Sequence, residues 1–307
     1  MKFDHILFPV DFSEHCTMLN SEVVWLASHF GSRVTLLHVF EVPASWYGGG
    51  DAPLMTAEDV RAYSEWHRQR LAQYSIELPE ARIERISAEG SPEWHISRCV
   101  RENGVDLVVM GTHGYGVLRR LLLGSTAMKV LHDVSCPVWT HSVATELGHT
   151  PMTGVSRIIC SIELTEEALP LLRFTKELAN EFNAQVRLVH SVPAMDSRPE
   201  RYVDVDLHRF LKDSAREEIS RLQTEAGTEF PLSVTEGNIA QDIAETALNE
   251  HADLVVIGRG RSQQIFGTLR SHAYGVIRQA PCPVLSYSME AQSADAASET
   301  RNVPSNS

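Results

Sequence analysis

Residues 107–133 read LVVMGTHGYGVLRRLLLGSTAMKVLHD and carry three local signals in succession. The apolar run LVVM is typical of a buried strand, and the glycines after it predict that the chain turns away from that strand. The Gly-Ser-Thr triplet at 124–126 then begins a segment with a helical pattern. A strand, a glycine-containing turn and a helix start in this order predict one unit of an α/β fold.

The same stretch predicts a binding site for an anion. Glycine permits positive φ and lets bare backbone approach a ligand. Free N–H groups at a helix start, with hydroxyl groups beside them, bind anions and most often phosphate. Ordinary turn and capping chemistry uses the same residue types. From these residues alone, a phosphate site and a purely structural turn both stay open.

An internal repeat determines the domain organisation. Four segments recur later in the chain in the same order: 5–14 at 157–166, 33–43 at 185–193, 89–111 at 236–258 and 135–140 at 280–286. We therefore predict two repeated domains, 1–144 and 155–288. A polar linker over 145–154 joins them, and the small polar residues of 289–307 predict a disordered tail.

Within each half, short apolar runs alternate with longer amphipathic ones. The strand-like runs of the first half are Ile6–Val10, Val34–Val39, Ile83–Ala88, Leu107–Met110 and Val138–Thr140. They lack a clean alternation of apolar and polar residues, as expected for strands that are covered on both faces. Helical patterns begin at Ser13 and cover 56–74 and 94–102. This order predicts a parallel sheet whose ligands lie at the carboxyl ends of the strands, where the strand order reverses.

The bulk composition narrows the class of protein. The 307 residues are 43% hydrophobic and 22% charged, which is an ordinary globular composition, and the length suggests about two domains. The net charge of −13 argues against a nucleic-acid-binding surface. No apolar run has the length of a membrane span, and the N-terminus reads as a strand rather than a signal peptide. Five scattered cysteines without a Cys-x-x-Cys pair favour a cytoplasmic location.

The combined motifs resemble the universal stress protein family. Gly-x-x-Gly, nine residues and Gly-Ser lie between the strand LVVMG and a helix that is followed by Cys-Pro-Val, and ILFPVDFSE is similar to the family's first strand. The resemblance covers nearly the whole chain, and two such halves are similar to the tandem members of the family. It implies that each half is a doubly wound α/β domain, a five-stranded parallel sheet of order 3-2-1-4-5 flanked by helices. One branch of the family binds ATP through this motif, and another lacks the motif and does not.

The resemblance implies one ATP site, in the first half. Asp11 would meet the adenine or ribose between an adenine wall and the backbone of Val39, and the glycines and hydroxyl groups would contact the ribose and phosphates. The implied site residues are Pro9, Val10, Asp11, Val39, Met110, Gly111, Gly114, Gly124, Ser125 and Thr126. We expect Mg²⁺ to arrive with ATP rather than in a dedicated protein cage.

The second half departs from this pattern. Arg261 stands in place of Gly114, and Arg270 in place of Gly124. Large side chains where backbone must touch phosphate predict that the second half binds no nucleotide. The cationic side chains of Arg259, Arg261 and Arg270 either bind another anion or, as we favour, pair with Glu163 or with surface acids.

The sequence therefore predicts an ATP-binding stress regulator. No positioned base or nucleophile is evident, and slow ATP hydrolysis or autophosphorylation on Ser125 or Thr126 stays open. The alternative is a protein-interaction module that needs no nucleotide, and an adenylating enzyme is less favoured because no second substrate motif is present. We expect the last strands of the two halves, PVWTHS and PVLSYS, to pair within the chain. A homodimer and an unidentified protein partner stay open, and we expect no nucleic acid and no membrane as partners.

Overall fold

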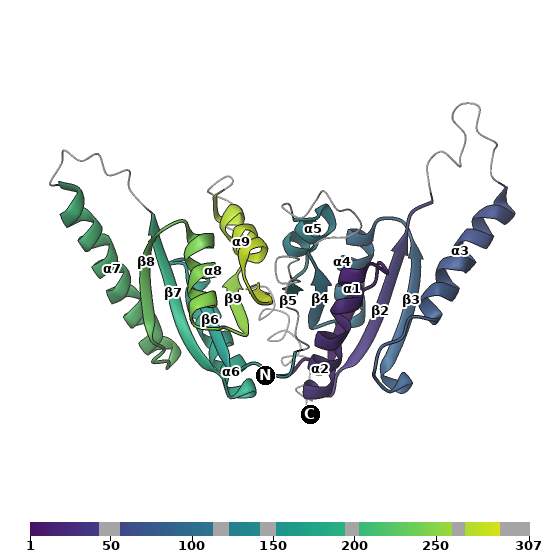
Figure 1. Cartoon of the computed structure of the whole chain (residues 1–307), viewed down its shortest axis with the longest axis horizontal. Coiled ribbons are helices and arrows are strands. Elements are labelled where there is room, and N and C mark those ends of the chain that lie inside the picture. The colour runs from purple at the N-terminus through teal and green to yellow at the C-terminus, as the bar shows by residue number, and fades with distance from the viewer. Residues whose placement is uncertain (43–55, 113–122, 142–151, 194–202, 260–267, 289–307) are drawn as a thin grey trace, which may run out of the picture.

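The computed structural model describes residues 1–42, 56–112, 123–141, 152–193, 203–259 and 268–288 (Figure 1). The first half contains β1 (His5–Pro9), α1 (Glu14–Met18), α2 (Asn20–Phe30), β2 (Arg33–Phe40), α3 (Ala57–Ala72), the 3-10 helix η2 (Glu80–Arg82), β3 (Ile83–Glu89), α4 (Pro92–Asn103), β4 (Leu107–Gly111), α5 (Ser125–Asp133) and β5 (Val138–His141). The second half contains β6 (Arg157–Ser161), α6 (Ala168–Phe182), β7 (Gln185–Pro193), α7 (Val203–Ala226), β8 (Leu232–Gly237), α8 (Ile239–Asn249), β9 (Leu254–Gly258), α9 (Thr268–Gln279) and β10 (Val284–Tyr287). Each predicted strand of the first half is present, with ends that differ by at most one residue.

The strands of the described residues form one sheet in the order β3-β2-β1-β4-β5-β10-β9-β6-β7-β8. Pairing is parallel within each half and antiparallel where β5 meets β10. The predicted α/β fold, a parallel sheet flanked by helices in each half, is confirmed. Because both halves use their last strand for the joint, the two sheets merge into one.

Two layers of apolar side chains cover the two faces of this sheet. Alternate residues of β1 point to opposite faces: Ile6 and Phe8 belong to one buried cluster, and Leu7 belongs to the other. The first cluster includes side chains from α2, α3, α6 and α7. The second includes side chains from α4, α5, α8 and α9. Both clusters contain residues of both halves, so the core is continuous across the joint.

Local capping explains where the helices begin and end. The Ser13 side chain accepts a hydrogen bond from Cys16 N and caps α1, which is the start that the sequence predicts. Thr56 and Asp59 form a capping box at α3, so the helix begins one residue later than predicted. The α4 helix begins at Pro92, two residues before the prediction, because the Ser91 side chain caps it. Gly104 ends α4 in the left-handed region at φ 63°, as a glycine stop should.

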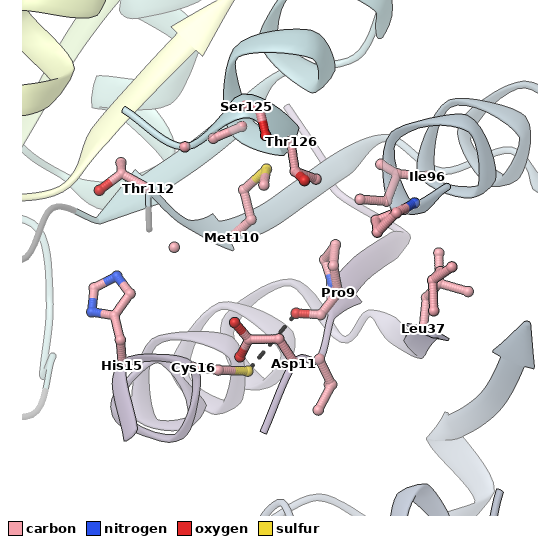
Figure 2. Close-up of a pocket in the computed structure, with 16 residues that line it drawn as sticks. Pro9, Asp11, His15, Cys16, Leu37, Ile96, Met110, Thr112, Ser125 and Thr126 are labelled. Atoms are coloured by element: carbon pink, nitrogen blue, oxygen red, sulfur yellow. Dashed lines mark hydrogen bonds between the residues drawn. The ribbon is translucent and has the colours of Figure 1, made fainter. Parts of the chain in front are cut away.

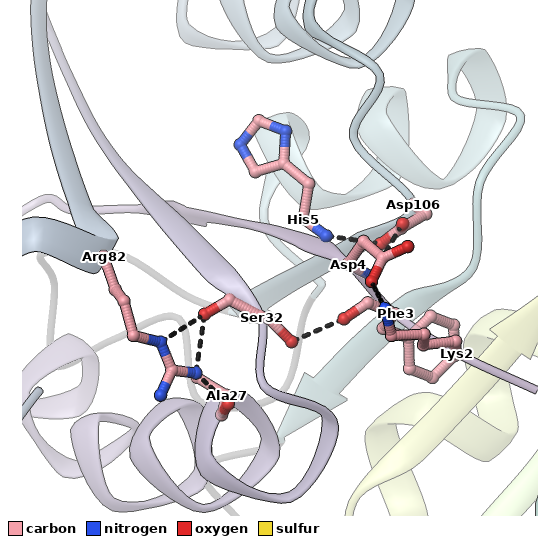
Figure 3. Close-up of polar contacts among 8 residues, drawn as sticks. All are labelled: Lys2, Phe3, Asp4, His5, Ala27, Ser32, Arg82 and Asp106. Atoms are coloured by element: carbon pink, nitrogen blue, oxygen red, sulfur yellow. Dashed lines mark hydrogen bonds and ion pairs between the residues drawn. The ribbon is translucent and has the colours of Figure 1, made fainter.

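A polar cluster at the amino ends of the first strands fixes their register (Figure 3). The carboxylate of Asp106 accepts hydrogen bonds from the backbone N–H groups of Asp4, at 2.9 Å, and His5, at 3.1 Å. These bonds hold the start of β1 against the start of β4. Nearby, the Arg82 guanidinium donates to the backbone carbonyl of Ser32 through both Nε, at 2.9 Å, and Nη2, at 2.7 Å. The cluster therefore joins the start of β1 to the start of β4, and the residue before β2 to the 3-10 helix before β3.

The joint between the halves is nearly two-fold symmetric. Trp139 of β5 faces Leu285 of β10 in the register. The Thr140 hydroxyl donates to the Val284 carbonyl, and the Ser286 hydroxyl donates to the Val138 carbonyl, both at 3.1 Å. Thr140 and Ser286 occupy matched positions of the repeat. The predicted pairing of the last strands within one chain is therefore confirmed.

A second contact between the halves lies on the face covered by α2 and α6. Phe182 packs against Trp25 and Phe30, with ring centroids 5.3 and 5.7 Å apart. His29 Nε2 lies 3.2 Å from Glu181 Oε1 beside these rings. The predicted domain limits fall largely on 142–151 and 289–307, outside the described residues, and stay predictions. Within the part of the chain that is described, no helix is long and apolar enough to span a membrane.

Candidate functional site

A cavity of about 290 Å³ opens in the first half where the strand order reverses (Figure 2). It lies at the carboxyl ends of β1, β2 and β4, beside the first turns of α4 and α5. In this sheet β1 separates β2 from β4, so the chain crosses in opposite directions on either side of β1. Ligands of open α/β sheets bind at this kind of position. The cavity is therefore the candidate functional site.

Nine of the ten predicted site residues line this cavity. They are Pro9, Val10, Asp11, Val39, Met110, Gly111, Gly124, Ser125 and Thr126. The tenth, Gly114, lies outside the described residues. Residues from β1, β2, β4 and α5, far apart in sequence, thus meet at one place.

The cavity has further lining residues that the sequence reading missed. They are His15, Cys16, Leu37, Pro92, Ile96, Thr112 and Ala127. Simple periodicities point to two of them. Leu37 precedes Val39 by two residues and shares its strand face, and Ile96 follows Pro92 by one helical turn. No sequence signal identified His15 and Cys16, because α1 turns back over the site only in the folded chain.

One wall of the cavity is apolar. Leu37 and Val39 contribute from β2, Ile96 contributes from α4, and Met110 contributes from the end of β4. Burial leaves Met110 6% exposed and Leu37 2% exposed. An apolar slot between strand and helix side chains suits a flat ring, and a few polar groups at its edge can fix the orientation of that ring.

Asp11 is held at the polar edge by its own turn. Its Oδ1 accepts from Ser13 N at 2.9 Å and from the Ser13 hydroxyl at 2.6 Å. Phe12 between them has φ 63°, a left-handed conformation that is uncommon for an aromatic residue. No hydrogen bond from the described residues reaches Asp11 Oδ2. The turn thus fixes the carboxylate and leaves one oxygen to accept from a ligand.

The first turn of α5 forms the other polar edge. Gly124 is the N-cap and offers no side chain to the first N–H groups. Its own N–H donates to the Thr112 carbonyl at 2.9 Å, which ties the helix start to the end of β4. The φ of Gly124 is −61°, so glycine is not needed here for a left-handed backbone. A glycine adds no side chain to the helix start, where free N–H groups can bind an anion.

The titratable groups beside the cavity do not supply a nucleophile. Burial raises the pKa of the Cys16 thiol to about 11, so the thiol stays protonated at neutral pH. His15 Nε2 lies 3.2 Å from the carbonyl oxygen of His141, which orients the ring. Among the described residues, no three His, Cys, Asp or Glu side chains are placed to hold a metal ion.

The matched region of the second half is acidic instead. Glu163 stands at the position of Asp11, and Glu167 stands at the position of His15. Burial, and then the charge of Glu167, raise the pKa of Glu163 to about 7. Ser191, the counterpart of Val39, donates its hydroxyl to Asp242 Oδ2 at 2.6 Å. A carboxyl group in place of His15, and an aspartate bonded to the counterpart of Val39, disfavour a phosphate ligand.

Arg259 makes two contacts that the sequence did not indicate. The prediction paired it with Glu163 or a surface acid, or gave it another anion, and that stays a prediction. Its guanidinium donates to the backbone carbonyls of Leu131 and Cys136 in the first half, both at 2.6 Å. Arg261 and the side chain of Arg270 lie outside the described part of the chain.

Comparison with known proteins agrees with this architecture. The chain matches the model of the universal stress protein family over residues 2–140 and 154–287. It is 26% identical over 140 residues to universal stress protein A homolog 1 of Coxiella burnetii, covering 45% of this chain and 95% of the relative. It is 28% identical over 142 residues to a universal stress protein of Thermus aquaticus, covering 44% of this chain and 96% of the relative.

A solved structure resembles the whole chain rather than one half. The universal stress protein of Archaeoglobus fulgidus DSM 4304 has a TM-score of 0.63 at 18% identity, covering 94% of this chain and 97% of that chain. At this identity the likeness shows the fold alone. The two segments that match the family model lie one in each repeat and together span most of the sequence. The chain therefore belongs to the universal stress protein family and carries two of its domains in tandem.

Proposed function

We propose that this protein binds one ATP, with Mg²⁺, in the first half and acts in the cytoplasm as a nucleotide-responsive regulator of a stress response. The observation that carries the proposal is the convergence of Asp11, the end of β4 and the uncapped start of α5 around one cavity. This convergence places an apolar slot, a hydrogen-bond acceptor and a helix start with free N–H groups around one cavity. ATP needs all three features.

Each part of ATP has a partner among the residues of the cavity. The apolar wall of Leu37, Val39 and Ile96 would take the adenine. Asp11 Oδ2 would accept from a ribose hydroxyl. The N–H groups and hydroxyls of Ser125 and Thr126 would donate to the phosphates. Mg²⁺ would neutralise phosphate charge and keep several of its waters, because it rarely needs a dedicated protein cage.

The second half is proposed to bind no nucleotide. Glu163 and Glu167 place carboxyl groups where the first half offers Asp11 and His15. Glu167 Oε2 would lie 3.5 Å from a Cβ built on Gly258, so this carboxyl group lies against the end of β9. An incoming phosphate would meet like charge there, and Ser191, which donates to Asp242, replaces the apolar Val39 of the wall. One nucleotide per chain is therefore expected.

The experiment compares a glycine at the site with a glycine elsewhere. In Gly124→Arg the new side chain copies Arg270 of the second half and fills the start of α5. Gly154→Arg is the control, because nothing lies within 4 Å of a Cβ built there. We would titrate both variants and the unchanged chain with Mg-ATP and count the adenine nucleotides released from the purified protein.

The unchanged chain and Gly154→Arg should each bind close to one ATP, and Gly124→Arg should lose at least about tenfold in affinity, or about 1.4 kcal/mol. An unchanged chain that binds no ATP would overturn the proposal. Close to two nucleotides per chain would contradict the assignment of the second half. Equal ATP affinity of Gly124→Arg and Gly154→Arg would show that the phosphates do not bind at the start of α5.

A further inference from the structure

The side chain of Arg259 crosses from the second half into the first. Its backbone directly follows β9, and the residue is 9% exposed. Nη1 donates to the carbonyl of Leu131, and Nη2 donates to the carbonyl of Cys136, both at 2.6 Å. Leu131 lies in the last turn of α5, and Cys136 lies between α5 and β5. One guanidinium therefore holds the end of the helix and the connection that follows it.

These bonds satisfy groups that a helix cannot satisfy by itself. The last four carbonyls of an α-helix have no intrahelical partner, and positive charge near them interacts favourably with the helix dipole. In α5, Val134 N donates to the Val130 carbonyl, and the next carbonyl in the chain accepts from Arg259. Hydrogen bonds from a charged donor are roughly twice as strong as those between neutral groups. The contact is therefore a firm anchor for the C-terminal end of α5.

A second contact from the same half meets the same helix. The Tyr274 hydroxyl of α9 lies 3.4 Å from the carbonyl of Met128, in the middle of α5. On the other side, Lys129 of α5 pairs with Glu93 of α4. The position of α5 thus depends on the second half as well as on its own domain. Figure 1 shows α5 and α9 next to each other above the joint of the sheet.

The opposite end of α5 forms the anion side of the cavity. The helix has nine residues, so it moves as one short rigid rod. A change in the anchor at Leu131 therefore moves the N–H groups at Ser125 and Thr126 as well. The hydrogen bond from Gly124 N to the Thr112 carbonyl holds the start of the helix next to the cavity.

The matched position of the first half holds a shorter side chain. Thr112 occupies the position of Arg259 in the repeat, and the backbone N–H groups of both residues donate to the last residue of the neighbouring strand. Thr112 N donates to the His141 carbonyl at 3.2 Å, and Arg259 N donates to the Tyr287 carbonyl at 2.7 Å. A threonine side chain is too short to span the distance that a guanidinium covers. The anchor at this position therefore runs from the second half to the first.

We propose that Arg259 is a positioning residue for the nucleotide site, holding α5 so that Ser125 and Thr126 face the phosphates. This inference rests on the proposed function of the first half. It gives the second half a role that does not require a ligand of its own. Arg259 itself touches no nucleotide and acts only through α5.

The experiment uses the full chain and separates the phosphate end of the site from its adenine end. Arg259→Met removes the donors but keeps a long apolar stem, and Arg259→Lys keeps a charge and one donor group. Arg216→Met is the matched control, because Arg216 pairs with Asp213 on the outer helix α7. Each variant is titrated with Mg-ATP and with adenosine, which has no phosphate. Hydrogen exchange of the α5 amides is measured without nucleotide, and circular dichroism checks the fold.

We expect Arg259→Met to weaken ATP binding about threefold to thirtyfold, the range for side chains that act on a ligand through the structure. Adenosine affinity should stay within about twofold, Arg259→Lys should recover part of the loss, and Arg216→Met should match the unchanged chain. The amides of residues 128–133 should exchange faster in Arg259→Met. Unchanged ATP affinity would overturn the inference, and so would an equal loss for ATP and adenosine.

Failure of the proposed function gives a different result. If the unchanged chain binds neither ATP nor adenosine, that function is wrong. The exchange rates of the α5 amides then decide the inference alone. Faster exchange in Arg259→Met would leave Arg259 as the residue that fixes α5, and equal rates in both proteins would overturn that role too.

Discussion

The two halves of the molecule share their internal scaffold and differ at the site. In the first half, Asp106 accepts from two backbone N–H groups at the start of β1, and Asp253 accepts from Ser156 N and Arg157 N in the second half. His38 Nδ1 donates to the Val10 carbonyl, and its counterpart in the second half donates to the Ile162 carbonyl. This histidine pair therefore makes the same backbone hydrogen bond at the end of the first strand of each half.

Around the candidate site, the residues of the two halves differ. Asp11 becomes Glu163, His15 becomes Glu167, and an apolar valine of β2 becomes a serine. The strand ends and helix starts carry these residues to equivalent places in both halves. Contacts that hold the backbone were retained after duplication, while side chains that line the cavity changed. The fold itself therefore does not require the residues of the candidate site.

A second difference between the halves lies beside the joint of the sheet. In the first half, the buried Glu22 carboxylate accepts from Trp139 Nε1 at 2.6 Å and contacts His141 Nδ1 at 2.5 Å. In the second half, the matched positions hold Phe174 and Tyr287, whose rings lie 4.4 Å apart. One half closes this position with a buried polar network, and the other closes it with two packed aromatic rings.

Among the variants that test this comparison, Glu22→Ala should have the largest effect on the free energy of unfolding. The change leaves the buried donors of Trp139 and His141 without their acceptor, and we expect a loss of about 3 to 5 kcal/mol in the free energy of unfolding. Copying the second half in Glu22→Phe, Trp139→Leu and His141→Tyr together should recover stability to within about 1.5 kcal/mol of the unchanged chain. Urea unfolding measures both. A triple variant no more stable than Glu22→Ala would show that the two solutions are not interchangeable.

Glu163→Gln tests the acidic site of the second half through its pH dependence. The folded-state pKa of about 7 lies above the ordinary value of 4.5, so the protonated carboxyl group is the form that the fold favours. This stabilisation is complete below about pH 4.5 and is lost as the pH rises through about 7. The variant should therefore be more stable than the unchanged chain at pH 8, by about 1 to 3 kcal/mol, and equal to it at pH 4.

Thermal melting of both proteins between pH 4 and pH 8 measures this difference. Glu177→Gln is a suitable control, because Glu177 lies on α6 away from the acidic positions. The expectation fails if Glu163→Gln melts at the same temperature as the unchanged chain throughout this range.

The hydroxyl bonds of the joint give the smallest expected effect. Thr140→Val and Ser286→Ala each remove one donor at a matched position, and each should cost about 0.5 to 1.5 kcal/mol. Because the two bonds are related by the symmetry of the joint, the two losses should agree within about 0.5 kcal/mol and should add in the double variant. Urea unfolding of the three variants measures this. Strongly unequal losses would show that one half dominates the joint.

Most of the fold could be predicted because its signals are local. The strand ends of the first half are within one residue of the prediction, since their apolar runs are bounded by glycine, polar and charged residues. The helix starts were less accurate at α4, where capping by Ser91 and the proline after it extend the helix. The repeat itself predicted that both halves share one architecture.

Some residues of the candidate site could be predicted from local sequence signals, and others could not. Gly111 and the Gly-Ser-Thr triplet belong to one motif, and the family resemblance implied Asp11, so their meeting at one cavity could be predicted. His15 and Cys16 have no such spacing and reach the cavity because α1 folds back after a left-handed residue at Phe12. Periodicity reports which face of an element is apolar, but it does not report what lies opposite that face.

By itself the sequence determined the duplication, the α/β class and the loss of the site pattern in the second half, because each depends on residues that are close in the chain. Only the tertiary structure decided where Arg259 goes. Its two acceptors, Leu131 and Cys136, lie more than one hundred residues earlier, and they are backbone carbonyls that every residue possesses. Such a contact has no sequence signature, since it depends on the antiparallel joint that brings α5 beside β9.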